Sequence, residues 1–148
     1  MIISYTEIEN HINKLFLTVN HQYDYIIGMS RGGLIPAVHL SHKFKVPMQV
    51  ADISHPLSKG DNIDEHKSII PNRFYWNSKI LIVDDILDSG HSVNECLNKL
   101  NIEKADVAVI YAKETGIETI SQNPKFGKLI YAEKLPNDAP FIYFPWER

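Results

Sequence analysis

The sequence has little of what marks several classes of protein. Its 148 residues include one cysteine, Cys96, so an internal disulfide and a cysteine-rich zinc site are both excluded. No uninterrupted apolar run approaches the roughly 20 residues that a membrane-spanning helix needs. The N-terminus lacks a basic region followed by an apolar run and a cleavage site, so we expect no signal peptide. These absences favour a soluble, cytoplasmic protein that has no membrane partner.

Charge of one sign is not in large excess either. The chain has 15 Lys and Arg against 18 Asp and Glu, for a net charge of −3 and a pI near 6.1. This balance argues against nucleic acid as the main partner. It does not exclude a small anionic ligand, because binding one depends on local groups. With 44% hydrophobic residues, the chain has ordinary globular composition, and we expect a single domain over residues 1–148.

Two periodicities of apolar residues predict alternating helices and strands. The first helix is expected to begin with a capping box in which Thr6 is paired with Glu9. We expect helices at 6–19, 34–44 and 92–100, and strands at 23–29, 48–53, 79–83, 106–112 and 128–133. This alternation predicts an α/β fold with a parallel sheet, whose ligands bind at the carboxyl ends of the strands. The polar stretch 54–78 is either a mobile functional lid, with or without a short β-arm, or contains an element that the pattern does not reveal.

The stretch "ILIVDDILDSGHS" is the least ordinary part of the sequence. Its "DSGHS" segment, 88–92, leads from a strand end into a helix, where backbone N–H groups and the helix dipole favour an anion. An equally good interpretation at this point is that Asp88, Ser89 or Ser92 simply caps the helix.

Asp84 and Asp85, just before this segment, favour a ligand-binding site over a simple helix cap. Adjacent strand residues point to opposite faces, so the two acids cannot serve the same contact. A buried acidic pair is costly unless a metal, hydroxyls or cations engage it. Mg²⁺, which prefers one or two carboxylates with substrate phosphates and water, would suit the pair, as would ribose hydroxyls.

Three other kinds of site use acids in this way. A P-loop NTPase needs G-x-x-x-x-G-K-[ST], which the sequence lacks. A response-regulator receiver domain carries its acidic pair at the end of the first strand, whereas this pair comes past the middle of the chain. A zinc hydrolase needs clustered histidines and acids. His39 and His42 lie three apart on a predicted helix without a carboxylate motif nearby, and we interpret them as solvated or core residues.

Here a resemblance becomes specific. "ILIVDDILDSGHS" resembles the phosphoribosyl pyrophosphate (PRPP) signature of the type I phosphoribosyltransferases, and "IIGMSRGGLIPA" resembles their pyrophosphate loop. The resemblance implies a mainly parallel twisted sheet flanked by helices, with a flexible lid loop at about 54–78 and a small C-terminal base-binding hood at about 133–148. It implies binding of ribose and 5′-phosphate by Asp84, Asp85, Asp88, Ser89, Gly90, His91 and Ser92. It implies binding of pyrophosphate by Ser30, Arg31, Gly32 and Gly33, with a 30–31 peptide bond that is often cis in relatives.

Two further segments resemble the purine branch of the family, and in particular the bacterial xanthine-guanine (hypoxanthine) phosphoribosyltransferases. In "VIYAKETG", Lys113 corresponds to a lysine that hydrogen-bonds the oxygen at purine C6; alternatively, it is a solvated lysine that ends a strand. In "DAPFIYFPWER", Phe141 corresponds to the base-stacking residue, and the carbonyl of Ile142 would accept from a base amino group. The alternative is that the aromatic residues here are core.

The resemblance implies Mg²⁺-dependent transfer of 5-phosphoribosyl from PRPP to guanine, xanthine or hypoxanthine. Asp85 would hold the metal, Asp88 would be the general base, and the enzyme would be a homodimer or homotetramer. Two departures keep open an alternative, a PRPP-binding regulator of the same fold with little or no catalysis. Phe141 stands where the subfamily has tryptophan, and Ser54-His55 stands where a Ser-Tyr pair is common.

Overall fold

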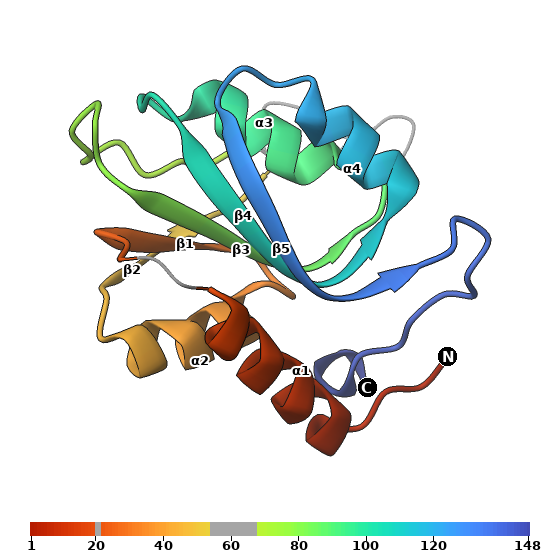
Figure 1. Ribbon diagram of the computed structural model, residues 1–148. Helices are drawn as coiled ribbons and strands as arrows, with labels where there is room; N and C mark the ends of the chain where they lie inside the picture. The colour runs from red at the N-terminus through yellow and green to blue at the C-terminus, as the bar shows by residue number, and fades with distance from the viewer. Residues whose placement is uncertain (20–21, 54–67) are drawn as a thin grey trace.

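A single parallel sheet forms the centre of the molecule (Figure 1). The computed structural model describes residues 1–19, 22–53 and 68–148. The sheet has five strands in the order β2-β1-β3-β4-β5, and every neighbouring pair is parallel. The strands are β1 (Tyr25–Met29), β2 (Met48–Ala51), β3 (Ile80–Leu87), β4 (Ala105–Lys113) and β5 (Phe126–Leu135). The predicted α/β class and parallel sheet are confirmed.

Helices cover both faces of this sheet. On one face lie α1 (Tyr5–Thr18) and α2 (Leu34–Phe44), and on the other α3 (His91–Lys99) and α4 (Glu114–Ser121). A 3-10 turn, η2 (Pro145–Glu147), lies near the C-terminus.

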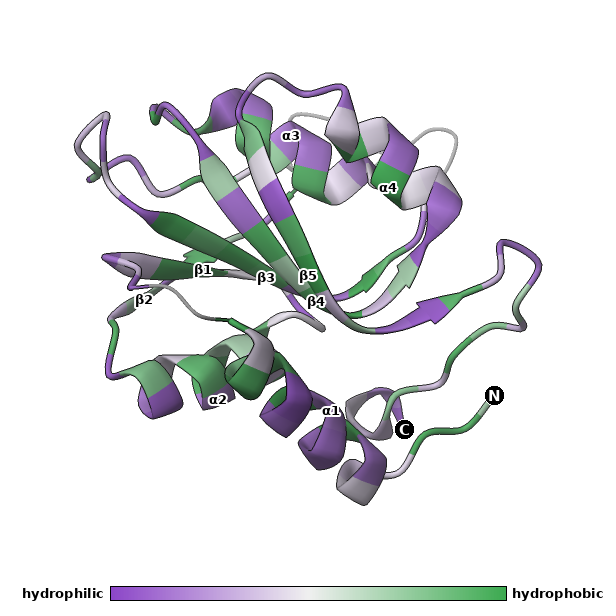
Figure 2. Ribbon diagram, in the orientation of Figure 1, coloured by the Kyte–Doolittle hydropathy of each residue, from purple (hydrophilic) through white to green (hydrophobic). Residues whose placement is uncertain are grey.

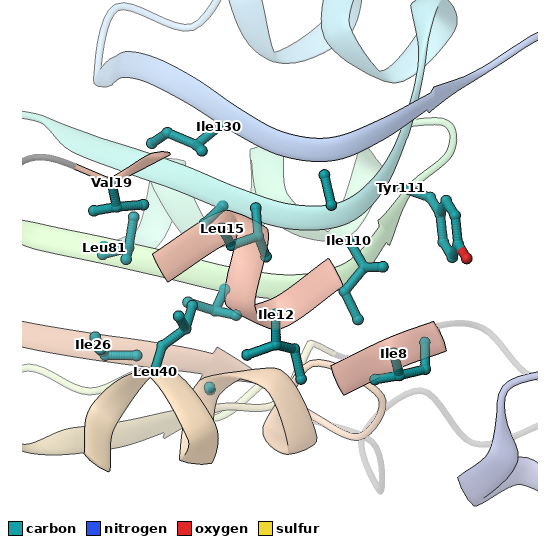
Figure 3. Close-up of a cluster of buried hydrophobic side chains, with 14 of the residues drawn as sticks. Ile8, Ile12, Leu15, Val19, Ile26, Leu40, Leu81, Ile110, Tyr111 and Ile130 are labelled. Carbon is teal, nitrogen blue, oxygen red and sulfur yellow. The ribbon is translucent and has the colours of Figure 1, made fainter. Parts of the chain in front are cut away.

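Double coverage explains why β3 begins as an apolar run without alternation, and why β4 is apolar from Val107 to Ala112. Leu81 and Val83 of β3 belong to the core beneath α1 and α2, whereas Ile80 and Ile82 belong to the core beneath α3. The strand centres are accordingly hydrophobic, and the outer sides of the helices are hydrophilic (Figure 2). Figure 3 shows the first of these cores, where side chains of α1 point towards β3 and β4.

One prediction about the helices was wrong, and one helix was missed. The capping box of α1 is formed by Ser4 and Glu7: the Ser4 hydroxyl accepts from the Glu7 amide at 3.2 Å, and a Glu7 carboxylate oxygen accepts from the Ser4 amide at 2.8 Å. The pattern occurs twice in "SYTEIE", and the sequence alone does not decide between the two. The eight-residue α4 was not predicted at all, because Gly116 and two threonines weaken its helical signal.

The predicted lid at 54–78 falls mostly on residues that the structure does not describe. Of its described part, Ile69 forms an antiparallel bridge with Asp52, with backbone hydrogen bonds of 2.9 and 2.7 Å. Within the described ranges, no helix has the length and apolar character needed to cross a bilayer.

Residues from the two ends of the sequence lie side by side (Figure 1). Ile2 forms a parallel bridge with Tyr143. The Tyr143 amide donates to the Met1 carbonyl at 2.8 Å, and the Ile3 amide donates to the Tyr143 carbonyl at 3.2 Å. We call this pairing of 1–3 with 141–143 the terminal ribbon.

Candidate active site

The carboxyl edge of the sheet collects most of the side chains that the sequence singled out. Strand β1 ends at Met29 before the Ser30–Gly33 turn, β3 ends at Leu87 before Asp88, and β4 ends at Lys113. Because the three strands are parallel and adjacent, their carboxyl ends lie at one edge of the sheet.

The turn after β3 forms a small hollow at the start of α3. Helix α3 begins after Gly90, which has a left-handed conformation with φ of 82°, so none of Asp88, Ser89 and Ser92 occupies the N-cap position. Ser89 instead accepts a long hydrogen bond of 3.3 Å from the amide of His91. The hollow has a volume of about 100 Å³ and is lined by Asp84, Ile86, Leu87, Asp88, Ser89, Gly90, His91, Ser92 and Val93. We call this segment, 88–92, the phosphate turn, after the ligand that the sequence resemblance predicts for it.

Asp84 and Asp85 lie against different elements of the fold, although their side chains also interact with each other. Asp85 lies against the turn after β1: a Cβ added to Gly32 would come within 1.9 Å of an Asp85 carboxylate oxygen. Asp84 lies towards Cys96 of α3. Burial of the Cys96 thiol raises its pKa to about 12, and the negative charge of Asp84 makes a smaller contribution to this rise.

Both carboxylates are held in an environment that disfavours their charged form. Burial raises the pKa of Asp84 well above its ordinary value, and repulsion by Asp85 adds to this. Burial also raises the pKa of Asp85, and the nearby carboxylate of Glu147 adds further repulsion. Cations or hydroxyl donors would relieve this cost by engaging the pair.

The turn after β1 is built to lie close to the acids. The Ser30–Arg31 peptide bond is cis, and the Ser30 amide donates to the Ala51 carbonyl at 2.8 Å. A Cβ on Gly33 would lie 2.6 Å from the carbonyl oxygen of Val83, so a larger residue there would force the turn away from β3. Arg31 itself is exposed, so its positive charge is available to a ligand.

Lys113 connects the phosphate turn to the end of β4. Its side-chain nitrogen lies 3.3 Å from a carboxylate oxygen of Asp88. Lys113 is only 8% exposed, whereas the side chain of Asp88 is 64% exposed. The interpretation of Lys113 as a solvated lysine is therefore wrong.

The C-terminal segment forms one wall of a larger cavity, of about 660 Å³, that reaches the turn after β1. Its lining residues are Arg31, Gly32, Phe141, Tyr143, Trp146 and Glu147. The aromatic residues divide between core and cavity. Phe144 is 2% exposed and stacks on Trp146 at 4.8 Å, whereas Phe141 is 68% exposed and meets Tyr143 edge-to-face at 4.9 Å.

Sequence reasoning did not identify Tyr143 and Glu147 as site residues. A sequence signal for Tyr143 is its position two residues after Phe141, because alternation in an extended segment places both on one side. In the structure residues 141 and 143 are exposed and residues 142 and 144 are buried. The C-terminal motif ends in an acid, Glu147, but no local pattern predicts its repulsion of Asp85, which depends on how distant parts of the chain come together.

A metal at this site would need ligands from a bound substrate. Among the described residues, no three His, Cys, Asp or Glu side chains are grouped so as to hold a metal ion. The acids Asp84 and Asp85 nevertheless fit Mg²⁺, which takes one or two protein carboxylates and completes its shell with phosphate oxygens and water.

Comparison with known proteins identifies the family. The model for the "Phosphoribosyl transferase domain" matches residues 3–142. The chain therefore belongs to the phosphoribosyltransferases, a family of enzymes, and the predicted family and enzyme class are confirmed.

The relatives and the solved structures agree with this assignment. The chain is 28% identical over 130 residues to a xanthine-guanine phosphoribosyltransferase of Idiomarina loihiensis, covering 85% of this chain and 72% of the relative. It is 27% identical over 132 residues to that of Cereibacter sphaeroides, covering 86% and 71%. The crystal structure of a purine phosphoribosyltransferase from Pyrococcus horikoshii matches with a TM-score of 0.73 and 29% identity, over 100% of this chain and 94% of the other.

Proposed function

We propose that the protein transfers the 5-phosphoribosyl group of PRPP to a 6-oxopurine base, with Mg²⁺, to give the nucleoside 5′-monophosphate and pyrophosphate. The observation that carries the proposal is the buried Lys113 that reaches Asp88 at 3.3 Å. This pair puts a donor for a purine oxygen beside a carboxylate that can take a proton. Similarity to enzymes named xanthine-guanine phosphoribosyltransferase supports the same reaction.

PRPP would occupy the carboxyl edge of the sheet. The backbone amides and hydroxyls of the phosphate turn would bind the 5′-phosphate at the start of α3. Asp84 and Asp85 would accept ribose hydroxyls, with Asp85 also a ligand of Mg²⁺. When bound, Mg²⁺ would supply positive charge that neutralises the pyrophosphate. Ser30, Arg31, Gly32 and Gly33 would bind the pyrophosphate through the Ser30 hydroxyl, the backbone amides of residues 31–33 and the Arg31 guanidinium.

The purine would lie in the cavity beside the C-terminal segment. Phe141 would stack on the ring, and the Ile142 carbonyl would accept from an amino group of the base. Lys113 would donate to the oxygen at C6. Adenine presents a donor at C6 instead, and a lysine has no acceptor for it, so we expect adenine to be a poor substrate.

Transfer needs a proton to leave the purine as N9 attacks C1 of the ribose. Asp88 would accept this proton from the N7 side. Its carboxylate is exposed and lies 3.3 Å from the side-chain nitrogen of Lys113, the proposed donor to the C6 oxygen. The remaining contribution of the chain is to position the two substrates and to surround the reacting centre with fixed charges and dipoles.

The test is pyrophosphate release from PRPP and Mg²⁺ with guanine, xanthine, hypoxanthine and adenine supplied separately. We expect release with at least one 6-oxopurine, little with adenine, and a loss of about 100-fold or more in Asp88→Asn, which keeps the shape but not the base. Glu118→Gln is the matched control, a carboxylate-to-amide change at an exposed position of α4.

The second candidate is a PRPP-binding regulator, favoured by the small and exposed Phe141 ring where a larger stacking surface would hold a base. It predicts no release with any base, while PRPP still raises the melting temperature. We also propose that the protein works as a homodimer or homotetramer in the cytoplasm, and light scattering of the purified protein would give its mass.

A further inference from the structure

Helix α4 begins directly after Lys113, and its first turn lies between the two parts of the site. The hydroxyl of Thr115 donates to the backbone carbonyl of Asp88 at 3.0 Å. The amide of Thr115 donates to the side-chain carbonyl of Asn137 at 3.2 Å. Asn137 belongs to the loop that leads from β5 to Phe141. Thr115 therefore contacts both the phosphate turn and this loop, residues 136–141, which we call the base-binding loop.

Close packing holds this contact in place. A Cβ on Gly116 would lie 2.6 Å from the Asp88 carbonyl oxygen, and a Cβ on Gly90 would lie 2.9 Å from the Gly116 carbonyl oxygen. The backbone of α4 thus rests directly on the phosphate turn, without side chains between them. Because the two glycines let the backbones of α4 and the phosphate turn approach closely, the Thr115 hydroxyl lies within hydrogen-bond distance of the Asp88 carbonyl.

We propose that Thr115 is a positioning residue that holds Asp88 in register with Lys113 and joins the phosphate turn to the base-binding loop. The inference rests on the proposed function, in which Asp88 takes a proton from the purine. Thr115 touches neither substrate in this scheme. It fixes the backbone from which the Asp88 carboxylate extends, and a carboxylate displaced from the purine would accept the proton less efficiently.

The side chain of threonine allows a clean separation of roles. Thr115→Val keeps the branched shape and removes the donor, whereas Thr115→Ser keeps the donor and removes a methyl group. Thr18→Val is the matched control: Thr18 is an exposed threonine near the end of α1, and its hydroxyl donates to the Lys14 carbonyl at 2.7 Å.

The experiment measures kcat and both KM values for the unaltered protein and the three variants. We expect kcat to fall about 3- to 10-fold in Thr115→Val, the effect of one ordinary hydrogen bond, with the KM for PRPP within about twofold. Thr115→Ser should restore kcat to within about twofold, and Thr18→Val should leave all three constants unchanged. Equal loss in the Val and Ser variants, or no loss in the Val variant, would overturn the proposal.

A second measurement keeps failure of this inference distinct from failure of the proposed function. Amide hydrogen exchange in the segment 87–92 should be faster in Thr115→Val than in Thr115→Ser, whether or not the protein turns over substrate. Unchanged exchange would show that the hydroxyl does not hold the turn, and the inference would then be wrong. Absence of pyrophosphate release in the unaltered protein, by contrast, would overturn the proposed function and with it the catalytic role given to Thr115.

Discussion

The two halves of the site differ in how the chain builds them. The phosphoribosyl half comes from nearly one continuous segment, in which β3 leads through the acidic pair and the phosphate turn into α3. The base half is assembled from distant pieces. Its cavity lies between the C-terminal segment, which carries the proposed base-stacking residue, and the turn after β1, which would bind the pyrophosphate of PRPP. The terminal ribbon supports the C-terminal segment from the other end of the sequence.

This difference teaches which half of the site can change independently. Substitutions in a continuous strand–turn–helix segment alter a backbone that is fixed on both faces by the core. The base half instead presents exposed aromatic side chains on a segment that lies outside the five strands of the sheet. We therefore expect changes in the base half to alter the choice of base while leaving PRPP binding intact.

Among the changes that compare the two halves, Lys113→Met should have the largest effect, because Lys113 pairs with Asp88 and would also bind the base. Its loss removes the donor for the C6 oxygen and the partner of Asp88, and a lost charged hydrogen bond is worth about 1.5–3 kcal/mol. We expect kcat/KM for 6-oxopurines to fall roughly 10- to 150-fold. The PRPP-induced rise in melting temperature should persist. A Lys128→Met control, at an exposed position of β5, should behave as the unaltered protein; a fall in PRPP binding with Lys113→Met would contradict the separation of the halves.

Phe141→Ala should come next and should affect the base half alone. Loss of a stacking ring costs about 1–3 kcal/mol per base, so the KM for the purine should rise about 5- to 150-fold. Phe141→Trp, with more stacking area, should lower it. Steady-state kinetics with each substrate varied in turn measures both, with Tyr131→Ala, at an exposed position of β5, as the aromatic control. An unchanged purine KM in Phe141→Ala would show that the base does not stack there.

Asp85→Asn should affect the phosphoribosyl half and should stabilise the free protein. The folded-state pKa of Asp85 is raised, so its charged form lowers the free energy of unfolding once the pH exceeds that pKa. We expect a gain of about 1 kcal/mol near neutral pH, seen as a rise of about 2–4 °C in melting temperature. The gain should shrink as the pH is lowered and the native carboxyl takes up its proton.

The same variant tests the proposed metal ligand. Stabilisation by PRPP with Mg²⁺ should be lost in Asp85→Asn, although the free protein melts at a higher temperature. Glu118→Gln, an exposed carboxylate-to-amide change, should show neither effect. A lower melting temperature in free Asp85→Asn would show that the carboxylate is stabilised by contacts stronger than its burial.

Arg148→Ala should have the smallest effect. The guanidinium of Arg148 donates to the Ile3 carbonyl at 3.3 Å, which joins the C-terminal segment to the terminal ribbon. This long and partly exposed hydrogen bond is worth at most about 0.5–1 kcal/mol, so the purine KM should rise no more than about fivefold. Lys104→Ala, which removes a cation at an exposed position outside the predicted lid, provides the control. A change in the KM for PRPP of equal size would mean that the ribbon supports both halves.

The contrast between a continuous segment and a site assembled from distant segments also explains which features the sequence could predict. The segment from Ile80 to Val93 carries its strand, its acids and its turn in order, so local rules were enough to place them at the carboxyl edge of the sheet. Contacts between distant segments were beyond such rules. The pairing of Lys113 with Asp88 and the repulsion between Glu147 and Asp85 depend on how β4, the C-terminal segment and β3 come together.

Local reasoning also failed where two local solutions were nearly equal. Ser4 and Thr6 each begin a capping pattern, and the structure uses Ser4. Helix α1 then places Ile8, Ile12 and Leu15 in the core.

Gly116 disfavours a helix when the sequence is considered alone. In the structure it is the residue that allows α4 to approach Asp88, and tertiary packing therefore overrides its low helix propensity.

The terminal ribbon also sets an order in which the site can be completed during synthesis. A chain emerges from the ribosome with its N-terminal end first, at about 5–20 residues per second. Ile3 therefore cannot pair with Tyr143 until residue 143 has been synthesised. The phosphate turn can form earlier, once β3 and its neighbouring strands β1 and β4 are present. A nascent chain would acquire its surface for the sugar phosphate before its surface for the base.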